Sequence, residues 1–142
     1  MKEKIASFLR EEGVILPKDF VVGVYFQILK FAGPLSGLIR KGSNEAGKAA
    51  AKSLISKVDF SKDELPEILK EFFSQAGFGN VNVSLSGNVL IVEIRDSFLL
   101  RAHPDENKAL SPLVGAIEGF VEEILGKEVK VKQEGKRITV EL

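Results

Sequence analysis

The fold class of this chain follows from residues 81–94, which read Val81-Asn82-Val83-Ser84-Leu85-Ser86-Gly87-Asn88-Val89-Leu90-Ile91-Val92-Glu93-Ile94. Apolar and polar residues alternate in the first half, which is the pattern of a strand with one buried face. Ser86-Gly87-Asn88 supplies a turn and the chain returns as a second strand, so the segment predicts a β-hairpin. The second strand is apolar on both faces, which predicts that the sheet is covered on both sides.

A helix and a second hairpin are expected after the first hairpin. The helix begins at Ser111-Pro112, where a cap precedes a proline in the first turn, and it ends at Gly126. The strands that follow have alternating apolar residues around a turn at Glu134-Gly135, namely Val129, Val131, Ile138, Val140 and Leu142. This order predicts an α+β fold, in which helices pack on a four-stranded antiparallel sheet made of the two hairpins.

The N-terminal half is predicted to be helical. One helix is expected from Lys2 to Glu12, with Gly13 as its stop. Another begins at Ser61-Lys62-Asp63-Glu64, which has the spacing of a capping box, and it ends at Gly77.

Two further helical segments lie between these. Phe20 to Ala32 has almost no polar face and is expected to be a helix, although its β-branched residues would also suit a strand. An all-round apolar helix must sit inside, covered by other elements or by a second subunit. Small residues are frequent between Gly33 and Ser53, which predicts a broken helical hairpin that turns at Gly42-Ser43. Because small side chains let helix backbones approach closely, this pair of helical arms is expected to be tightly packed.

The composition is that of a single domain over residues 1–142, with an N-terminal helix and lead-in over 1–18. The chain is 44% hydrophobic and 28% charged, so it can fill a core without metals or disulfides. Twenty basic residues balance twenty acidic ones, which argues against a dedicated nucleic-acid binder. The charged N-terminus is not a secretory signal, and no apolar run reaches the roughly 20 residues of a membrane span. A cytoplasmic protein is expected.

The residues offer little catalytic chemistry. There is no cysteine and a single histidine, His103, so no metal site, cofactor or catalytic residue is predicted. An enzyme is therefore the least favoured class. Asp96-Ser97, with Arg95 and Arg101 nearby, either caps a strand end or anchors an anionic headgroup. The absence of cysteine, the single methionine and the many Lys and Glu residues are also features of thermophilic proteins.

The helix of residues 111–125 carries two glycines on the side opposite its apolar arc. Gly115 and Gly119 each cost roughly 1 kcal/mol relative to alanine if that side meets only water. Two explanations remain open. Either another backbone, helix or ligand comes close at an interface formed by these glycines, or the helix is simply packed tightly within the monomer.

The sequence resembles the 4-vinyl reductase domain, a small-molecule-binding α+β domain related to the core subunits of TRAPP vesicle-tethering complexes. The resemblance covers residues 19–142 and is carried by the glycine-punctuated helical pair, the hairpin ending Val92-Glu93-Ile94-Arg95-Asp96-Ser97, and two later segments. These are Leu113-Val114-Gly115-Ala116-Ile117-Glu118-Gly119-Phe120 and Leu125-Gly126-Lys127-Glu128-Val129-Lys130-Val131. The resemblance implies a homodimer that binds hydrocarbon-like or aromatic molecules in an apolar pocket. Family members often carry a cysteine where this chain has Leu110, so neither a family metal site nor lipid attachment through cysteine transfers.

The leading hypothesis is thus a homodimeric domain that holds a small apolar ligand between its helices and sheet. The surplus of large apolar side chains suggests the ligand-binding residues: Tyr25, Phe26, Leu29, Phe72, Phe73 and Phe98. The alternative is a non-catalytic interaction or scaffold subunit that uses the same apolar surface as a protein–protein seam.

Overall fold

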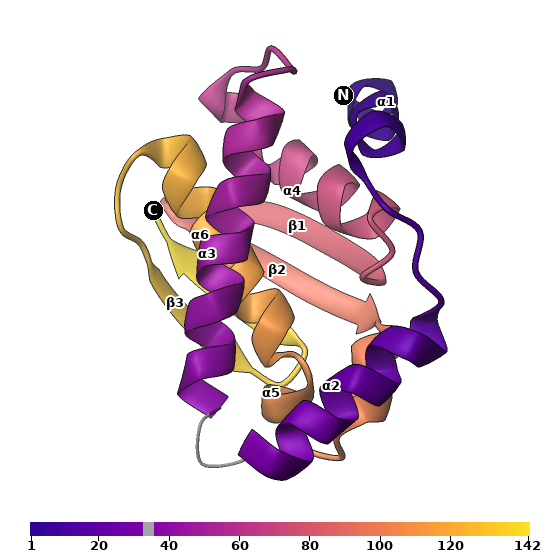
Figure 1. The fold of residues 1–142 in the computed structure, drawn as a ribbon. Coiled ribbons are helices and arrows are strands. Elements are labelled where there is room, and N and C mark those ends of the chain that lie inside the picture. Colours follow the sequence, from indigo (N-terminus) through magenta and orange to yellow (C-terminus); the bar gives the residue numbers. More distant parts are fainter. Residues whose placement is uncertain (33–35) are drawn as a thin grey trace.

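The computed structural model describes residues 1–32 and 36–142. Figure 1 shows its helices and its single sheet, with β1 and β2 beside α4 and with α3 and α6 side by side. The helices are α1 (Lys2–Glu12), α2 (Lys18–Ala32), α3 (Ser36–Ile55), α4 (Leu65–Gln75), α5 (Glu106–Ala109) and α6 (Ser111–Leu125), with short 3₁₀ turns η2 (Lys62–Glu64) and η3 (Phe98–Ala102). The strands are β1 (Asn80–Ser86), β2 (Val89–Asp96), β3 (Lys130–Glu134) and β4 (Arg137–Glu141).

The four strands form one antiparallel sheet in the order β1-β2-β4-β3, so the predicted α+β fold with two hairpins is confirmed. The second hairpin pairs with the first through β4 and β2, where Val92 lies opposite Ile138. Val92 and Ile138 are both buried and face the helices. None of the described helices is both long and apolar enough to span a bilayer.

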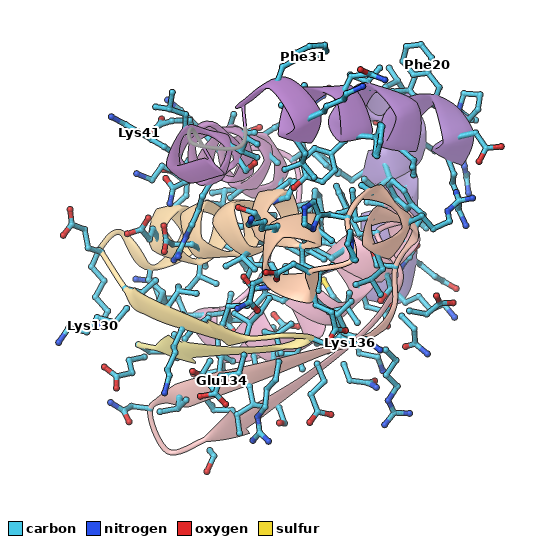
Figure 2. All side chains as sticks on the ribbon, turned by 90° about the horizontal axis from the view of Figure 1, so that it is seen from below. Phe20, Phe31, Lys41, Lys130, Glu134 and Lys136 are labelled. Atoms are coloured by element: carbon cyan, nitrogen blue, oxygen red, sulfur yellow. The ribbon has the colours of Figure 1, made fainter. Side chains whose placement is uncertain are left out.

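The helices cover only one face of the sheet, as the nearly edge-on view in Figure 2 shows. The prediction of cover on both faces is therefore wrong for the described residues. Ile91, on the open face, is only half-buried and lies opposite Ser84 and Thr139. Because Ser84 and Thr139 on the flanking strands are polar, this face of the sheet can remain in contact with solvent although β2 places Ile91 on it.

At three glycines, the contact between α3 and α6 is made by backbone atoms. A Cβ atom added at Gly115 would overlap the backbone carbonyl of Arg40, and one at Gly119 would overlap that of Asn44. Gly47 of α3 meets the carbonyl of Ala116 in the same way. The close approach expected at Gly115 and Gly119 is thus made by α3 of the same chain, which is the second of the two explanations.

Polar side chains lie beside these glycines and tie the two helices together. Arg40 Nη2 lies 2.7 Å from Glu118 Oε2, on the neighbouring helix. The Asn44 side-chain amide donates to Glu118 Oε1 at 2.9 Å and to Glu122 Oε1 at 2.8 Å. This network fixes the register of α3 along α6, and α6 lies between α3 and the sheet.

The predicted break at Gly42-Ser43 is wrong, because α3 runs without interruption from Ser36 to Ile55. The Ser43 hydroxyl donates to the Ile39 carbonyl one turn earlier instead of capping a new helix. Gly42 faces open space, so no turn is needed to accommodate it. Gly33, where the predicted hairpin begins, lies outside the described residues.

We predict that Gly119→Ala lowers the free energy of unfolding by about 1–3 kcal/mol, because its methyl group must displace the α3 backbone. Gly42→Ala is the matched control in the same helix pair. Its methyl group meets nothing within 4 Å, so the substitution is expected to stabilise the helix by up to about 1 kcal/mol. Urea denaturation of both variants measures the difference. Equal stability of Gly119→Ala and the unsubstituted chain would contradict the backbone contact.

Candidate functional site

The most unusual element is α2, an almost entirely apolar helix that lies on the surface. The expectation that this helix sits inside is wrong for the chain by itself, because over its described side chains, residues 18–31, only Tyr25 and Leu29 are buried. The physical reason is that α3 already covers α6. This leaves α2 at the edge of the molecule, over η3 (Figure 1). Cover by a second subunit, the other possibility, is not tested by this structure.

The inner side of α2 is held by one specific hydrogen bond and by apolar packing. The Tyr25 hydroxyl donates to the Lys108 carbonyl in α5 at 2.6 Å. Burial raises the pKa of Tyr25 to about 12, because the phenolate would lose its hydration. Leu29 follows one turn later and is also buried.

Phe72 and Phe73, both predicted to bind ligand, lie in the filled core. Their ring centroids are 4.7 Å and 5.5 Å from that of Phe120, respectively. Side chains therefore occupy the space around these rings. Contacts continue outward from Phe73 to Phe78 at 5.8 Å, and from Phe78 to Phe98 at 6.4 Å. A continuous row of aromatic rings thus connects the core to the protein surface at Phe98.

Phe98 lines a solvent-open groove of about 410 Å³ at the start of α2. The groove is also lined by charged and small residues, namely Lys18, Gly77, Gly79, Asp96, Ser97 and Arg101. The Ser97 hydroxyl accepts a hydrogen bond from the Leu99 amide at 3.3 Å, so it caps η3. Arg101 Nη1 lies 3.1 Å from Asp19 Oδ1, an ion pair between η3 and α2. Phe98 is thus the large apolar side chain among the described lining residues, and the others are glycines or polar side chains.

The six predicted ligand residues thus fall in different places. Tyr25 and Leu29 lie under α2, Phe72 and Phe73 lie in the core, and Phe98 lies at the groove. Phe26 is half-exposed on the side of α2. Lys18 was not predicted to line the groove, because only the tertiary packing of α2 on η3 brings it beside Phe98.

The outer side of α2 was not foreseen either, although its spacing was available in the sequence. Phe20, Val24 and Phe31 are separated by four and seven positions, which places them on one side of a helix. All three are exposed. Nothing in a single helix, however, distinguishes an apolar side that will be buried from one that will not.

His103 has a local structural partner. Its Nδ1 atom accepts a hydrogen bond from the Asp105 amide at 3.0 Å. Across the described ranges, no group of three or more histidine, aspartate or glutamate side chains is arranged to bind a metal ion.

Two solved structures share this fold. One is trafficking protein particle complex subunit 3 from Naegleria fowleri, covalently bound to palmitic acid, with a TM-score of 0.64 and 18% identity over 88% of this chain and 94% of that chain. The other is the phenol-responsive sensory domain of the transcription activator PoxR with phenol, with a TM-score of 0.61 and 14% identity over 99% of this chain and 88% of that chain. No family model and no curated protein matches the sequence.

These likenesses confirm the expected relation in fold to a TRAPP subunit. At 18% and 14% identity they show the fold alone. Membership of the 4-vinyl reductase family stays a prediction, since no family model supports it.

We predict that the attachment of α2 loosens between pH 10 and pH 12. The pKa of Tyr25 rises from its usual 10.0 to about 12 on folding. In this range the unfolded chain has released the phenolic proton while the folded chain still holds it. The stability contributed by the neutral phenol is thus complete below pH 10 and is lost as the pH approaches 12.

The measurement is direct because Tyr25 is the only tyrosine and the chain has no tryptophan. Ultraviolet absorbance of the tyrosinate should titrate well above the value for free tyrosine. Tyr25→Phe should cost about 0.5–1.5 kcal/mol at neutral pH and should flatten the fall in stability above pH 10. An ordinary titration midpoint near 10 would mean that α2 is not docked on α5.

Proposed function

We propose that this chain is a non-catalytic, homodimeric binding domain for a small apolar or aromatic molecule. The observation that carries the proposal is the position of α2, a nearly all-apolar helix on the surface whose contacts with the core are made by Tyr25 and Leu29, with the partly buried Val22 beside them. Exposed apolar surface of this extent is typical of a binding region. The ligand would lie in the groove at the start of α2, with its apolar part on Phe98 and extending toward the underside of the helix.

Three features support this site over others. Phe98 is the outermost ring of the aromatic row, so a ligand stacked on it would continue that row. Charged groups line the rim, namely Lys18, Asp96 and Arg101, and because Arg101 is paired with Asp19, Lys18 is the cation that a phenol hydroxyl or a carboxylate would meet. Both proteins of similar fold are bound to apolar molecules, palmitic acid in one and phenol in the other. A covalent thioester is excluded here because the chain has no cysteine.

The driving force would be burial of apolar surface, at about 25 cal/mol per Å² removed from water. The polar rim would contribute orientation more than affinity. Because α2 is held on the body mainly by Tyr25 and Leu29, a small displacement of the helix would admit a ligand larger than the open groove.

The alternative is an interaction subunit that uses the outer side of α2 as a protein–protein seam and binds no small molecule. It is favoured by the direction of Phe20 and Phe31, both of which point away from the body of the protein (Figure 2). The two functions differ in what they require of Phe98. The ligand site needs this ring, whereas a seam on the outer side of α2 does not.

We predict that phenol, an alkylphenol or palmitate raises the thermal unfolding midpoint of the purified protein in proportion to the logarithm of its concentration above Kd. Phe98→Ala should weaken binding at least about tenfold, since a buried aromatic contact contributes more than about 1.4 kcal/mol. Leu85→Ala is the control, because Leu85 is exposed on β1 and does not line the groove, and this variant should bind as the unsubstituted chain does. Calorimetric titration gives the Kd values.

The absence of a shift with every compound, together with no retained ligand in native mass spectrometry of the freshly purified protein, would contradict the ligand site. Unchanged binding in Phe98→Ala, or equal loss in Phe98→Ala and Leu85→Ala, would place the ligand elsewhere. A complex that dissociates on dilution and binds none of the compounds would favour the interaction subunit.

A further inference from the structure

The outer side of α2 carries an apolar stripe with no partner in the described chain. Phe20 is 60% exposed, Val24 is 47% exposed and Phe31 is 80% exposed. The labelled rings of Phe20 and Phe31 project from the same side of the helix in Figure 2, away from the rest of the protein. The linker before α2 adds further exposed apolar residues, Val14, Ile15 and Leu16. Clustered surface of this kind marks an interaction site more often than isolated exposed apolar residues do.

The stripe on one copy would match the same stripe on a second copy whose α2 runs in the opposite direction. Phe20 and Phe31 stand near the two ends of α2, eleven positions apart. Asp19 and Lys30 are also eleven positions apart, each directly beside one of these rings. A second α2 laid antiparallel on the first therefore brings Phe20 against Phe31 of the other copy, and Asp19 against Lys30 of the other copy.

The parallel arrangement is disfavoured by the same residues. It would bring Asp19 level with Asp19 and Lys30 level with Lys30, so each end of the pair would carry two charges of the same sign and neither charge would gain an opposite partner. In the antiparallel arrangement every contact occurs twice about a two-fold axis, which is the commonest symmetry of soluble dimers. The axis would pass between Val24 and Gln27.

Gly23, near the middle of α2, is suited to such a crossing. A Cβ atom at this position would meet nothing within 4 Å in the single chain, unlike the glycines that hold α3 against α6. A glycine in an exposed helix interior costs about 1 kcal/mol relative to alanine. At the crossing point of two helices, the same glycine would let the backbones come close.

We infer that α2 is a self-recognition helix that pairs antiparallel with α2 of a second copy, with Phe20–Phe31 contacts flanked by Asp19–Lys30 ion pairs. The inference deepens the proposed function, since it assigns the homodimer a surface and a geometry. It leaves the groove at Phe98 on the body side of α2, so dimer formation and ligand binding use different sides of the helix.

Sedimentation velocity over a range of protein concentrations, without added ligand, tests the surface. Phe31→Ser should raise the dimer Kd at least about tenfold, because an aromatic anchor is lost twice in the symmetric interface. Leu85→Ser is the matched control. Leu85 is 51% exposed on β1, so its replacement should leave the Kd unchanged. Circular dichroism of both variants verifies that the fold is retained.

Charge exchange tests the direction of the pair. Lys30→Asp should weaken the dimer several-fold, and the double variant Asp19→Lys with Lys30→Asp should restore much of the loss. Because Asp19 also pairs with Arg101 within the chain, the double variant is compared with Asp19→Lys alone, which loses the same intrachain pair.

Engineered cysteines give a second test of direction, since the natural chain has none. Under mild oxidation, Asp19→Cys protein mixed with Lys30→Cys protein should form a crosslinked heterodimer, whereas each variant alone should crosslink poorly. Efficient crosslinking of each variant with itself, or a dimer insensitive to Phe31→Ser, would overturn the antiparallel pair while leaving a homodimer possible on another surface.

A protein that stays monomeric at about 100 μM, well above the Kd range of specific dimers, would overturn both the pair and the homodimer. If the monomer instead binds phosphatidylcholine vesicles through α2, the stripe is a lipid-binding surface. Neither result decides the ligand site, which is tested separately by the thermal shift and by Phe98→Ala.

Discussion

The architecture depends on the contact between the backbones of α3 and α6. Gly47, Gly115 and Gly119 have no side chains, and each lies against a carbonyl group of the facing helix. Helices in globular proteins usually pack with axes 8–10 Å apart, and side chains fill the interval. Removing side chains on both sides brings α3 down onto α6, where the network of Arg40, Asn44 and Glu118 fixes its position. Since α3 takes this place, α2 is left at the edge of the molecule.

The displaced α2 has two sides with different surroundings. Its inner side is docked through Tyr25 on the Lys108 carbonyl, beside the groove that ends at Phe98. Its outer side presents Phe20, Val24 and Phe31 to solvent. One helix thus separates the proposed ligand site from the proposed dimer surface. The two are adjacent and are joined by the ion pair between Arg101, which lines the groove, and Asp19, which belongs to the proposed dimer surface.

Features set by neighbouring residues could be predicted from the sequence. Gly126 ends α6 at φ +70°, and Gly87 makes the turn of the first hairpin at φ +60°, because glycine adopts these angles without steric cost. Glu64 accepts a hydrogen bond from the Ser61 amide, as the capping-box spacing required. The boundaries of the hairpins and of α6 followed from such local chemistry, and so did the α+β class.

Features set by tertiary packing could not be predicted. Gly42-Ser43 has the composition of a turn, yet it continues a helix because the glycines of α3 and α6 align only if α3 is straight. The large rings were recognised as a surplus, but composition does not distinguish Phe73, which is 2% exposed in the core, from Phe26, which is 48% exposed. The grouping of the ligand residues could therefore be predicted only in part from the sequence. The position of Lys18 at the groove could not be predicted at all.

The glycine contact between α3 and α6 also has a mechanical consequence. Helices separated by side chains can slide past each other by small changes of rotamer, whereas backbones in direct contact have no such adjustable layer. We therefore expect α3 and α6 to move together, as one rigid unit packed on the sheet. The parts left free to move are then α2 and η3, so a ligand in the groove would displace the helix that carries the proposed dimer surface.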